Sequence, residues 1–263
     1  MLPAWLIVVI LGIVEGITEF IPISSTGHLL VVEHWLGGQK SDLFNVVIQV
    51  GAVLAVLPLF RERIAMMLRL NEAPSRLLTA KVFVAFFITC VGGLVMKKIG
   101  FKLPEELLPV AVALVAGGIV FIIVEAALKG RALATEISWA VVIVVALGQL
   151  VAAAFPGASR SGSTIMFAMA LGTGRVAATE FSFLVGIPTM LAAGVLEIHS
   201  GLKDGQHEPW SLIALGFVAA AIVSFIAVKW LLRYVQSHTF VNFGIYRIVF
   251  GGLILLGLFY IHR

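Results

Sequence analysis

The sequence predicts an all-α polytopic membrane protein, in which a re-entrant helical hairpin followed by three transmembrane helices occurs twice as an inverted repeat. Three observations lead to this fold class. The chain is 60% hydrophobic and 12% charged, with a mean hydropathy of +1.09, which is far more apolar than a soluble domain. Six apolar runs are long enough to cross a bilayer. Two further apolar regions are interrupted near their middles by similar motifs.

A crossing of the hydrocarbon core requires about 20 apolar residues. The six full spans that meet this requirement cover residues 42–60, 80–98, 106–128, 177–198, 209–232 and 241–261. No long polar stretch separates them, so the 263 residues are expected to form a single integral-membrane domain.

The two re-entrant hairpins are expected in the interrupted regions, residues 2–36 and 137–173. Proline, glycine and hydroxyl residues break them at Pro22 to Gly27 and at Pro156 to Gly162. Each flanking arm is short for an independent crossing. Broken backbone at membrane depth is tolerated only where protein or a water-filled cavity satisfies its polar groups. Both breaks are therefore expected to lie inside the molecule.

The two breaks resemble each other, and this predicts the repeat. "FIPISSTG" aligns with "FPGASRSG", which pairs Ser24 with Ser159 and Ser25 with Arg160. Three spans follow each break, giving halves of about 1–130 and 131–263. A hairpin returns to its own side whereas three spans end on the opposite side, so the second half must be inverted. Such repeats bring broken helices together near the midplane. Chance similarity of two Ser/Gly-rich breaks is the alternative.

The basic residues predict orientation rather than nucleic-acid binding. The net charge is +4, but Lys and Arg fall mostly in loops, where they set topology and meet the headgroups of membrane lipids. One side collects Arg61, Arg63, Arg69, Arg76, Lys81, Lys129, Arg131, Arg175, Lys229 and Arg233; the other has Lys40, Lys97, Lys98, Lys102, Lys203 and Arg263. The richer side is expected to be cytoplasmic, which places both termini outside and makes the first hairpin enter from the outer face.

Two carboxylates in the first hairpin are candidate site residues. Glu15 and Glu19 are four residues apart and therefore share a helical face. A carboxylate inside a membrane usually faces a polar cavity or a partner. The pair suits a site for Mg²⁺ or Ca²⁺, which take oxygen ligands, or an acid/base pair beside a phosphate. Alternatively, both acids are solvated at the outer interface or cap the break.

The hydroxyl cluster after them is the second candidate. Ser24, Ser25 and Thr26 precede Gly27, His28 and an apolar helix. Any one of the hydroxyls could be the N-cap of that helix. Together with the glycine they suit an anion bound at a helix N-terminus. His28 is three residues beyond Ser25, within reach across the first turn, and could activate the hydroxyl or a water molecule. A purely structural histidine is the alternative.

Arg160 is the candidate residue of the second break, flanked by Ser159, Ser161 and Gly162. A buried guanidinium requires an anion, and its planar fork binds phosphate bidentately. The alternative partner is Glu15 or Glu19, in an ion pair that a substrate would displace. The acids thus come from one half and the arginine from the other, a division that suits phosphoryl transfer.

Other polar residues within the apolar runs are less specific. Asn45 and Gln49, four apart, could line a cavity or join helices. Arg247 is expected to be structural. Glu125 is expected at an interface, and the Gly12–Gly16 spacing is a weak signal for helix packing.

The motifs "EGITEFIPISSTGH" and "PGASRSG" resemble those of the bacterial undecaprenyl-pyrophosphate phosphatases of the bacitracin-resistance type, and the similarity covers essentially the whole chain. It implies a bacterial inner-membrane enzyme that hydrolyses polyprenyl diphosphate to the monophosphate, recycling the lipid carrier for cell-wall synthesis, with a site reached from the outer face. It further implies that Glu15 and Glu19 serve catalysis and a divalent cation, that Ser25 is nucleophile or phosphate contact, and that His28 and Arg160 are the family's histidine and essential arginine.

Two other classes of membrane protein share some of these features. The phosphatidate-phosphatase type requires a histidine and an aspartate where this chain has Met166 and Ala170, so that family is excluded. A lipid carrier or flippase with the same inverted repeats is the remaining alternative. The sequence leaves open whether Ser25 or water is the nucleophile, which metal binds, and whether the protein is a monomer or a homodimer.

Overall fold

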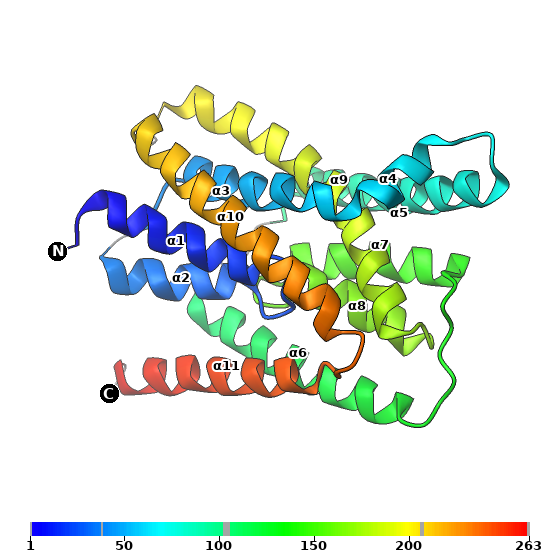
Figure 1. Cartoon of the computed structure of the whole chain (residues 1–263). Helices are drawn as coiled ribbons and strands as arrows, with labels where there is room; N and C mark the ends of the chain where they lie inside the picture. Colours follow the sequence, from blue (N-terminus) through cyan, green and yellow to red (C-terminus); the bar gives the residue numbers. More distant parts are fainter. Residues whose placement is uncertain (1, 38, 102–105, 206–207, 262–263) are drawn as a thin grey trace.

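The computed structural model describes residues 2–37, 39–101, 106–205 and 208–261. These ranges fold into helices joined by short loops, and the order of elements is α1 (Ala4–Thr18), α2 (Ser25–Leu36), α3 (Asp42–Val56), a 3₁₀ turn η1 (Leu57–Phe60), α4 (Arg61–Leu68), α5 (Ala73–Lys98), α6 (Leu107–Leu128), α7 (Trp139–Ala154), α8 (Arg160–Ala170), α9 (Arg175–Asp204), α10 (Trp210–Tyr234) and α11 (Val241–Ile261). The helices lie roughly along one axis (Figure 1).

Six helical segments in the described ranges are long and apolar enough to cross a membrane: Asp42–Leu68, Ala73–Lys98, Leu107–Leu128, Arg175–Lys203, Trp210–Tyr234 and Val241–Tyr260. They coincide with the six predicted spans, which are thereby confirmed. The first is continuous through α3, η1 and α4, with Pro58 accommodated at the start of the 3₁₀ turn, where its missing N–H costs nothing. The chain is a multi-span membrane protein.

The two interrupted regions form helical hairpins, α1–α2 and α7–α8, as expected. They enter from opposite ends of the molecule and their turns approach each other in its middle (Figure 1). Ser24 and Ser159 occupy corresponding places as N-caps of α2 and α8, with φ of 77° and 68°. Residues other than glycine rarely adopt this left-handed region. The division into repeats 1–130 and 131–263 stays a prediction, with which these paired features agree.

Glycines allow α1 to pack closely against α10. A Cβ added at Gly16 would lie 2.7 Å from the carbonyl oxygen of Ala220 and 2.9 Å from the backbone nitrogen of Ser224, and one at Gly12 would meet the backbone of Gly216. Small residues that let two backbones approach are the usual basis of helix association in membranes. The predicted packing role of Gly12 and Gly16 is therefore confirmed.

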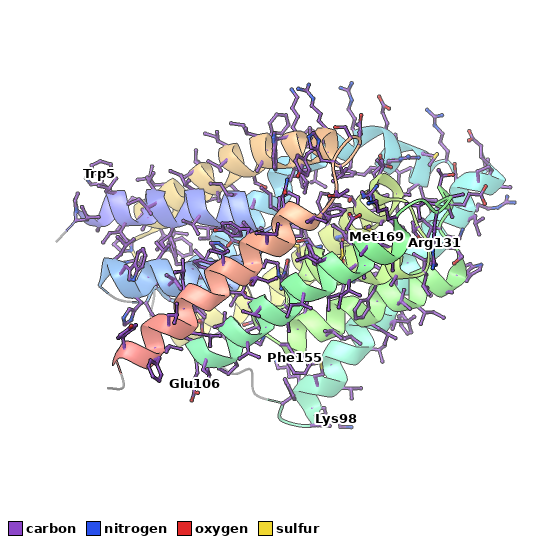
Figure 2. All side chains as sticks on the ribbon, turned by 90° about the horizontal axis from the view of Figure 1, so that it is seen from below. Trp5, Lys98, Glu106, Arg131, Phe155 and Met169 are labelled. Carbon is purple, nitrogen blue, oxygen red and sulfur yellow. The ribbon has the colours of Figure 1, made fainter. Side chains whose placement is uncertain are left out.

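The core surrounds the two breaks. Phe20, fully buried in the first break, meets Phe183 of α9 edge to face at 5.1 Å between ring centroids, and Phe183 meets Phe60 in the same way at 6.0 Å. Large apolar side chains such as Phe83 and Phe87 remain exposed on the outside, as expected of a surface that faces lipid. Figure 2 shows Trp5 near one end of the helices, Arg131 near the other and Phe155 between them.

Glu125, which is expected from the sequence to lie at an interface, is buried and paired. It is 4% exposed, and its carboxylate forms an ion pair with Arg175 and accepts a hydrogen bond of 2.8 Å from the backbone N–H of Phe240. A buried carboxylate needs such partners. Lys102 and Arg263, which were counted with the outer side, lie outside the described residues.

Candidate active site

A cavity of about 290 Å³ lies between the two breaks. Both hairpins and the spans α3, α5 and α9 supply its walls: Glu19, Ser24, Ser25, Thr26, Gln49, Thr89, Gln149, Ala152, Ala153, Pro156, Gly157, Ser159, Arg160, Thr189, Met190 and Ala193. The fold thus brings together the acid and hydroxyls predicted from the first half and the arginine predicted from the second.

Arg160, the first residue of α8, supplies the positive charge of this cavity. Its side chain is 14% exposed, and Nε, Nη1 and Nη2 all lack a hydrogen-bond partner. Its closest carboxylate oxygen is Glu19 Oε1, 3.5 Å from Nη2, and its guanidinium lies 5.5 Å from the centroid of the Phe20 ring. Unused donors on a buried guanidinium are costly. The site is therefore arranged to receive an anion with several acceptor atoms.

Gly186 of α9 makes the room that Arg160 occupies. An added Cβ at Gly186 would collide with Nη1 of the guanidinium and would lie 2.8 Å from its central carbon. Gly186 is followed by Pro188 inside the same helix. The absence of a side chain at this one position therefore sets where the arginine lies.

Ser25 and Glu19 are paired directly. Ser25 Oγ donates a hydrogen bond of 2.7 Å to Glu19 Oε2, and the Gln49 amide donates to the same oxygen at 3.4 Å. Glu19 is 6% exposed. A hydroxyl bonded to a carboxylate in this way is a nucleophile next to a general base. This arrangement can remove the proton from Ser25 as its oxygen attacks an electrophile.

The remaining predicted binding residues divide into two groups. Thr26 lines the cavity, as do Ser24 and Ser159, but the latter two also act as caps: Ser24 Oγ accepts from Gly27 N–H at 3.4 Å and Ser159 Oγ from Gly162 N–H at 3.2 Å. The second group consists of Gly27, Ser161 and Gly162, which shape the turns and do not line the cavity. The Ser161 hydroxyl is fully buried, 3.2 Å from that of Ser159. The capping alternative thus holds for Ser24, and Ser159 has the same role at the start of α8.

The expected contact between His28 and Ser25 is absent, which corrects the sequence-based geometry. His28 Nδ1 lies 2.7 Å from the backbone oxygen of Ser24 and Nε2 lies 2.7 Å from the hydroxyl of Tyr246, and the ring stacks on Phe250 at 4.2 Å. Because a carbonyl can only accept, Nδ1 must donate. In this structure His28 fastens the break to α11 and does not reach the cavity.

Glu15 and Glu19 are neighbours, as their spacing predicts, but Glu15 is not among the residues that line the cavity of Glu19. It is 1% exposed and lines a second, smaller cavity of about 180 Å³ together with residues of α2 and α3. Its Oε2 atom is buried and has no hydrogen-bond partner. Within the described ranges no group of three or more His, Cys, Asp or Glu side chains is gathered closely enough to hold a metal ion. Any cation here would need amide, hydroxyl or water ligands as well.

Three cavity residues were missed from the sequence: Thr89, Gln149 and Thr189. The Gln149 amide donates to Thr89 Oγ1 at 2.9 Å, while Gln149 Oε1 is buried without a partner. All three are polar residues inside apolar runs, a signal that the sequence does carry. Gln49 does both things that the sequence leaves open: it lines the cavity, and its amide joins α3 to Glu19 of the first hairpin.

Arg247 of α11 joins both breaks to α6. It is fully buried, and its guanidinium donates to the backbone oxygens of Pro22 in the first break, at 3.3 Å, and of Gly157 in the second, at 3.0 Å. It also donates to Ala113 and Leu114 of α6, at 3.3 and 3.4 Å. Its predicted structural role is confirmed, and its partners are carbonyls rather than an acid.

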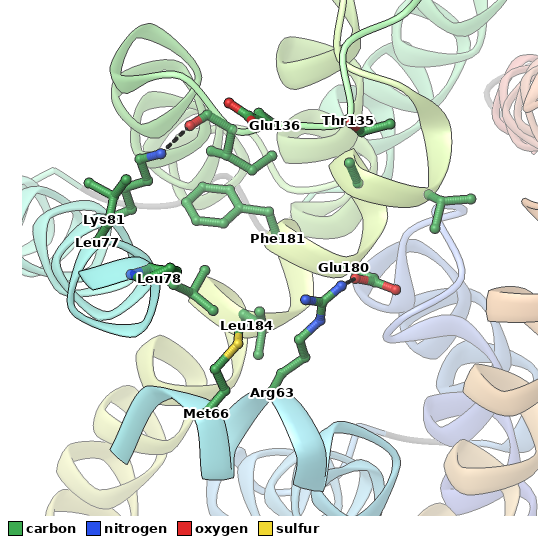
Figure 3. Close-up of a pocket in the computed structure, with 14 residues that line it drawn as sticks. Arg63, Met66, Leu77, Leu78, Lys81, Thr135, Glu136, Glu180, Phe181 and Leu184 are labelled. Atoms are coloured by element: carbon green, nitrogen blue, oxygen red, sulfur yellow. Dashed lines mark hydrogen bonds and ion pairs between the residues drawn. The ribbon is translucent and has the colours of Figure 1, made fainter. Parts of the chain in front are cut away.

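Two further cavities border these elements. An apolar one of about 420 Å³ lies between α6 and the second hairpin, and Phe155 and Ala158 of the break contribute to it. Another, of about 430 Å³, lies at the end of the molecule that carries Arg63 and Lys81. Figure 3 shows the latter, where Arg63 pairs with Glu180 at 2.8 Å and Lys81 donates to a backbone oxygen. It contains none of the predicted site residues.

Comparison with known proteins identifies the family. The profile of the family described as Bacitracin resistance protein BacA matches residues 8–253, a range that includes every candidate residue above. The chain is 53% identical over 250 residues to an undecaprenyl-diphosphatase of Rhizobium etli (strain CIAT 652), with 94% of each chain covered. It is 49% identical over 250 residues to an undecaprenyl-diphosphatase of Xylella fastidiosa (strain 9a5c), covering 94% of this chain and 95% of that one. This chain therefore belongs to the bacitracin resistance protein BacA family.

Proposed function

We propose that this protein hydrolyses undecaprenyl diphosphate to undecaprenyl phosphate and inorganic phosphate. The relatives described above are named undecaprenyl-diphosphatase, and their similarity covers 94% of this chain. The single observation that carries the proposal is the cavity in which the guanidinium of Arg160, whose three nitrogens have no hydrogen-bond partner, lies near the hydrogen-bonded pair of Ser25 and Glu19. A positive clamp close to a nucleophile with its base is what phosphoryl transfer requires.

The proposed reaction begins when the diphosphate enters this cavity and draws Arg160 away from Glu19. Ser25 Oγ attacks the terminal phosphorus and its proton passes to Glu19 Oε2, the atom to which it is already bonded. The bond from that phosphorus to the bridging oxygen breaks, and undecaprenyl phosphate leaves. Water then attacks the phosphorus of the phosphoserine and the bond from that phosphorus to Ser25 Oγ breaks. Glu19 returns its proton to Ser25 Oγ, and inorganic phosphate leaves carrying the oxygen and protons of the water. Arg160 stabilises the charge on the transferred group throughout.

The lipid tail is proposed to follow the apolar cavity between α6 and the second hairpin. Phe155 and Ala158 line that cavity, while their neighbours Pro156, Gly157 and Ser159 line the polar one. The break thus separates an apolar from a polar space within a few residues. A lipid diphosphate has this same division between tail and headgroup.

A divalent cation, Mg²⁺ or Ca²⁺, is proposed as cofactor. Glu15 fits the role of ligand, because its buried Oε2 lacks any partner. Glu19 fits less well in this structure, since donors from Ser25 and Gln49 already occupy Oε2. When bound, the ion would supply positive charge that helps to bind and polarise the diphosphate.

The site is proposed to open to the outer face of the bacterial inner membrane. The excess of Lys and Arg at the end carrying Arg63, Lys81 and Arg131 supports a cytoplasmic location for that end. The first hairpin then enters from outside, where the product would be returned to the pool that carries cell-wall precursors.

The test is release of inorganic phosphate from undecaprenyl diphosphate by the purified protein in detergent, with Mg²⁺, with Ca²⁺ and with chelator. Arg160→Ala is expected to lower kcat/KM by about 10²–10³-fold, the usual cost of removing a donor to transition-state charge. Ser25→Ala is expected to reduce kcat at least as strongly.

Arg61→Ala is the matched control, because it removes an exposed positive charge from the far end of the bundle and is expected to act like wild type. Full activity of the Ser25→Ala variant would show that water, and not Ser25, is the nucleophile. If folded wild-type protein bound the lipid but released no phosphate, the phosphatase function would be contradicted and a lipid carrier would be favoured.

A further inference from the structure

The cavity of about 180 Å³ that Glu15 faces is distinct from the cavity of about 290 Å³ between the two breaks, which lies around Arg160 and is called the phosphate cavity below. The smaller cavity has polar walls of its own. It lies where α1, α2 and α3 meet, and its lining residues are Glu15, Ser25, Thr26, Leu29, Leu30, Glu33, Asn45, Val46 and Gln49. Ser25, Thr26 and Gln49 also line the phosphate cavity, so the two spaces adjoin.

Three oxygen atoms on the walls of this cavity are buried without a hydrogen-bond partner. They are Glu15 Oε2, Glu33 Oε1 and Asn45 Oδ1, one from each of the three helices. Glu15 is 1% exposed and Glu33 is 2% exposed. A single unsatisfied buried oxygen is unusual, and three that line one cavity indicate a shared partner.

The chemistry of these atoms specifies the partner. All three are acceptors and two belong to carboxyl groups, so they favour a cation or a hydrogen-bond donor over an anion. The amide of Asn45 lies beside the carboxyl group of Glu33, and Lys40 places one positive charge near the same group. Hard cations such as Mg²⁺ and Ca²⁺ take carboxylate and amide oxygens together with water. The cavity has room for an ion with several water molecules.

We propose that this cavity is a divalent-cation site, in which Glu15 Oε2, Glu33 Oε1 and Asn45 Oδ1 are protein ligands and water completes the coordination. Glu33 and Asn45 thereby become metal ligands. The inference deepens the proposed function, because it rests on the cofactor suggested there and assigns its ligands. The carboxyl groups of Glu15 and Glu19 are neighbours, and Ser25, Thr26 and Gln49 line both cavities, so the ion would lie beside the phosphate cavity.

The experiment measures binding without any lipid substrate. Mn²⁺, a hard probe ion, is titrated into purified protein in detergent, free Mn²⁺ is followed by its electron paramagnetic resonance signal, and Ca²⁺ and Mg²⁺ are added as competitors. Wild type is expected to bind one equivalent. Glu33→Gln keeps the shape and removes one charged ligand, and is expected to weaken binding about 10-fold or more, since affinity follows ligand charge.

Asn45→Asp is the second variant, and its expected effect has the opposite sign. It adds a charged oxygen at the same place, so it should tighten Mn²⁺ binding several-fold, which damage to the fold would not produce. Glu136→Gln is the matched control, because it removes an exposed carboxylate in the loop before α7; it should bind as wild type.

Wild-type affinity in both Glu33→Gln and Asn45→Asp would overturn the site while leaving the phosphatase intact. Stoichiometric binding by a protein that releases no phosphate would uphold the site and overturn the phosphatase.

Discussion

Single residues decide the geometry of the phosphate cavity, and most of them act through position rather than chemistry. Ser25 and Glu19 are the residues proposed to carry the chemistry, whereas Arg160 depends on the space left by Gly186. The side chain of Arg160 has no hydrogen bond to fix it, apart from its long approach to Glu19 and its contact with the Phe20 ring. Its place is therefore set by what surrounds it.

Gly186→Ala is accordingly expected to lower activity although it touches no reacting atom. The new methyl group would displace the guanidinium, and a misplacement of about 1 Å can cost on the order of 10²-fold in rate. Phosphate release gives the measurement. Gly252→Ala is the control, because an added Cβ there meets nothing within 4 Å. Equal activity of the two variants would show that catalysis does not depend on the present position of the Arg160 guanidinium.

Two residues show where sequence reasoning succeeds and fails at this scale. The proximity of Glu19 and Ser25 could be predicted, because six residues across a tight break leave the two side chains few places to go. The partner of His28 could not, because Tyr246 is 218 residues away. Three residues along a helix allow contact with Ser25, but they do not require it.

At the scale of elements, the two breaks are held in place by N-capping serines and by the buried guanidinium of Arg247. Ser24 and Ser159 cap α2 and α8 from left-handed conformations, which cost about 1 kcal/mol or more each and persist only where the surroundings enforce them. Arg247 is part of that enforcement, since it binds a carbonyl oxygen in each break. The two hairpins are thereby fastened to α11 and α6.

Arg247→Met is therefore expected to destabilise the protein by about 2–4 kcal/mol, because it leaves buried carbonyls without a donor, and to reduce activity by loosening both breaks. Arg247→Lys should recover only part of this, since an ammonium cannot reach the same set of acceptors. Thermal unfolding in detergent measures the loss. Arg233→Met, at an exposed end of α10, is the control, and an equal midpoint for the two Met variants would contradict the role.

The helices themselves were largely predictable and their partners were not. Span positions follow from apolar length, and the two hairpins follow from broken runs too short to cross. Glu33 illustrates the limit: it reads as one polar residue in a short helix, and only the packing of α2 against α1 and α3 gives it Glu15 and Asn45 as neighbours. Likewise Glu125 looks interfacial until the fold supplies Arg175.

At the scale of the whole molecule, the orientation in the membrane can be tested with single cysteines. Cys90 is the one natural cysteine, so Cys90→Ser provides the background. Glu106→Cys, before α6, is expected to react with a membrane-impermeant maleimide added to intact cells, whereas Ser237→Cys, between α10 and α11, should react only after lysis. Both positions are exposed. The reverse pattern would place the site opening in the cytoplasm.

The ion pair between Arg160 and Glu19 gives the resting molecule an internal competitor for its own substrate. An incoming anion must bind Arg160 more strongly than the Glu19 carboxylate does. The existing pair is weak, because its atoms are 3.5 Å apart, which is longer than the best geometry for such a pair. A singly charged lipid headgroup gains little by this exchange, while a diphosphate with several oxygens gains much. We therefore expect Glu19 to help this cavity to discriminate between a diphosphate and the singly charged headgroups of the surrounding phospholipids.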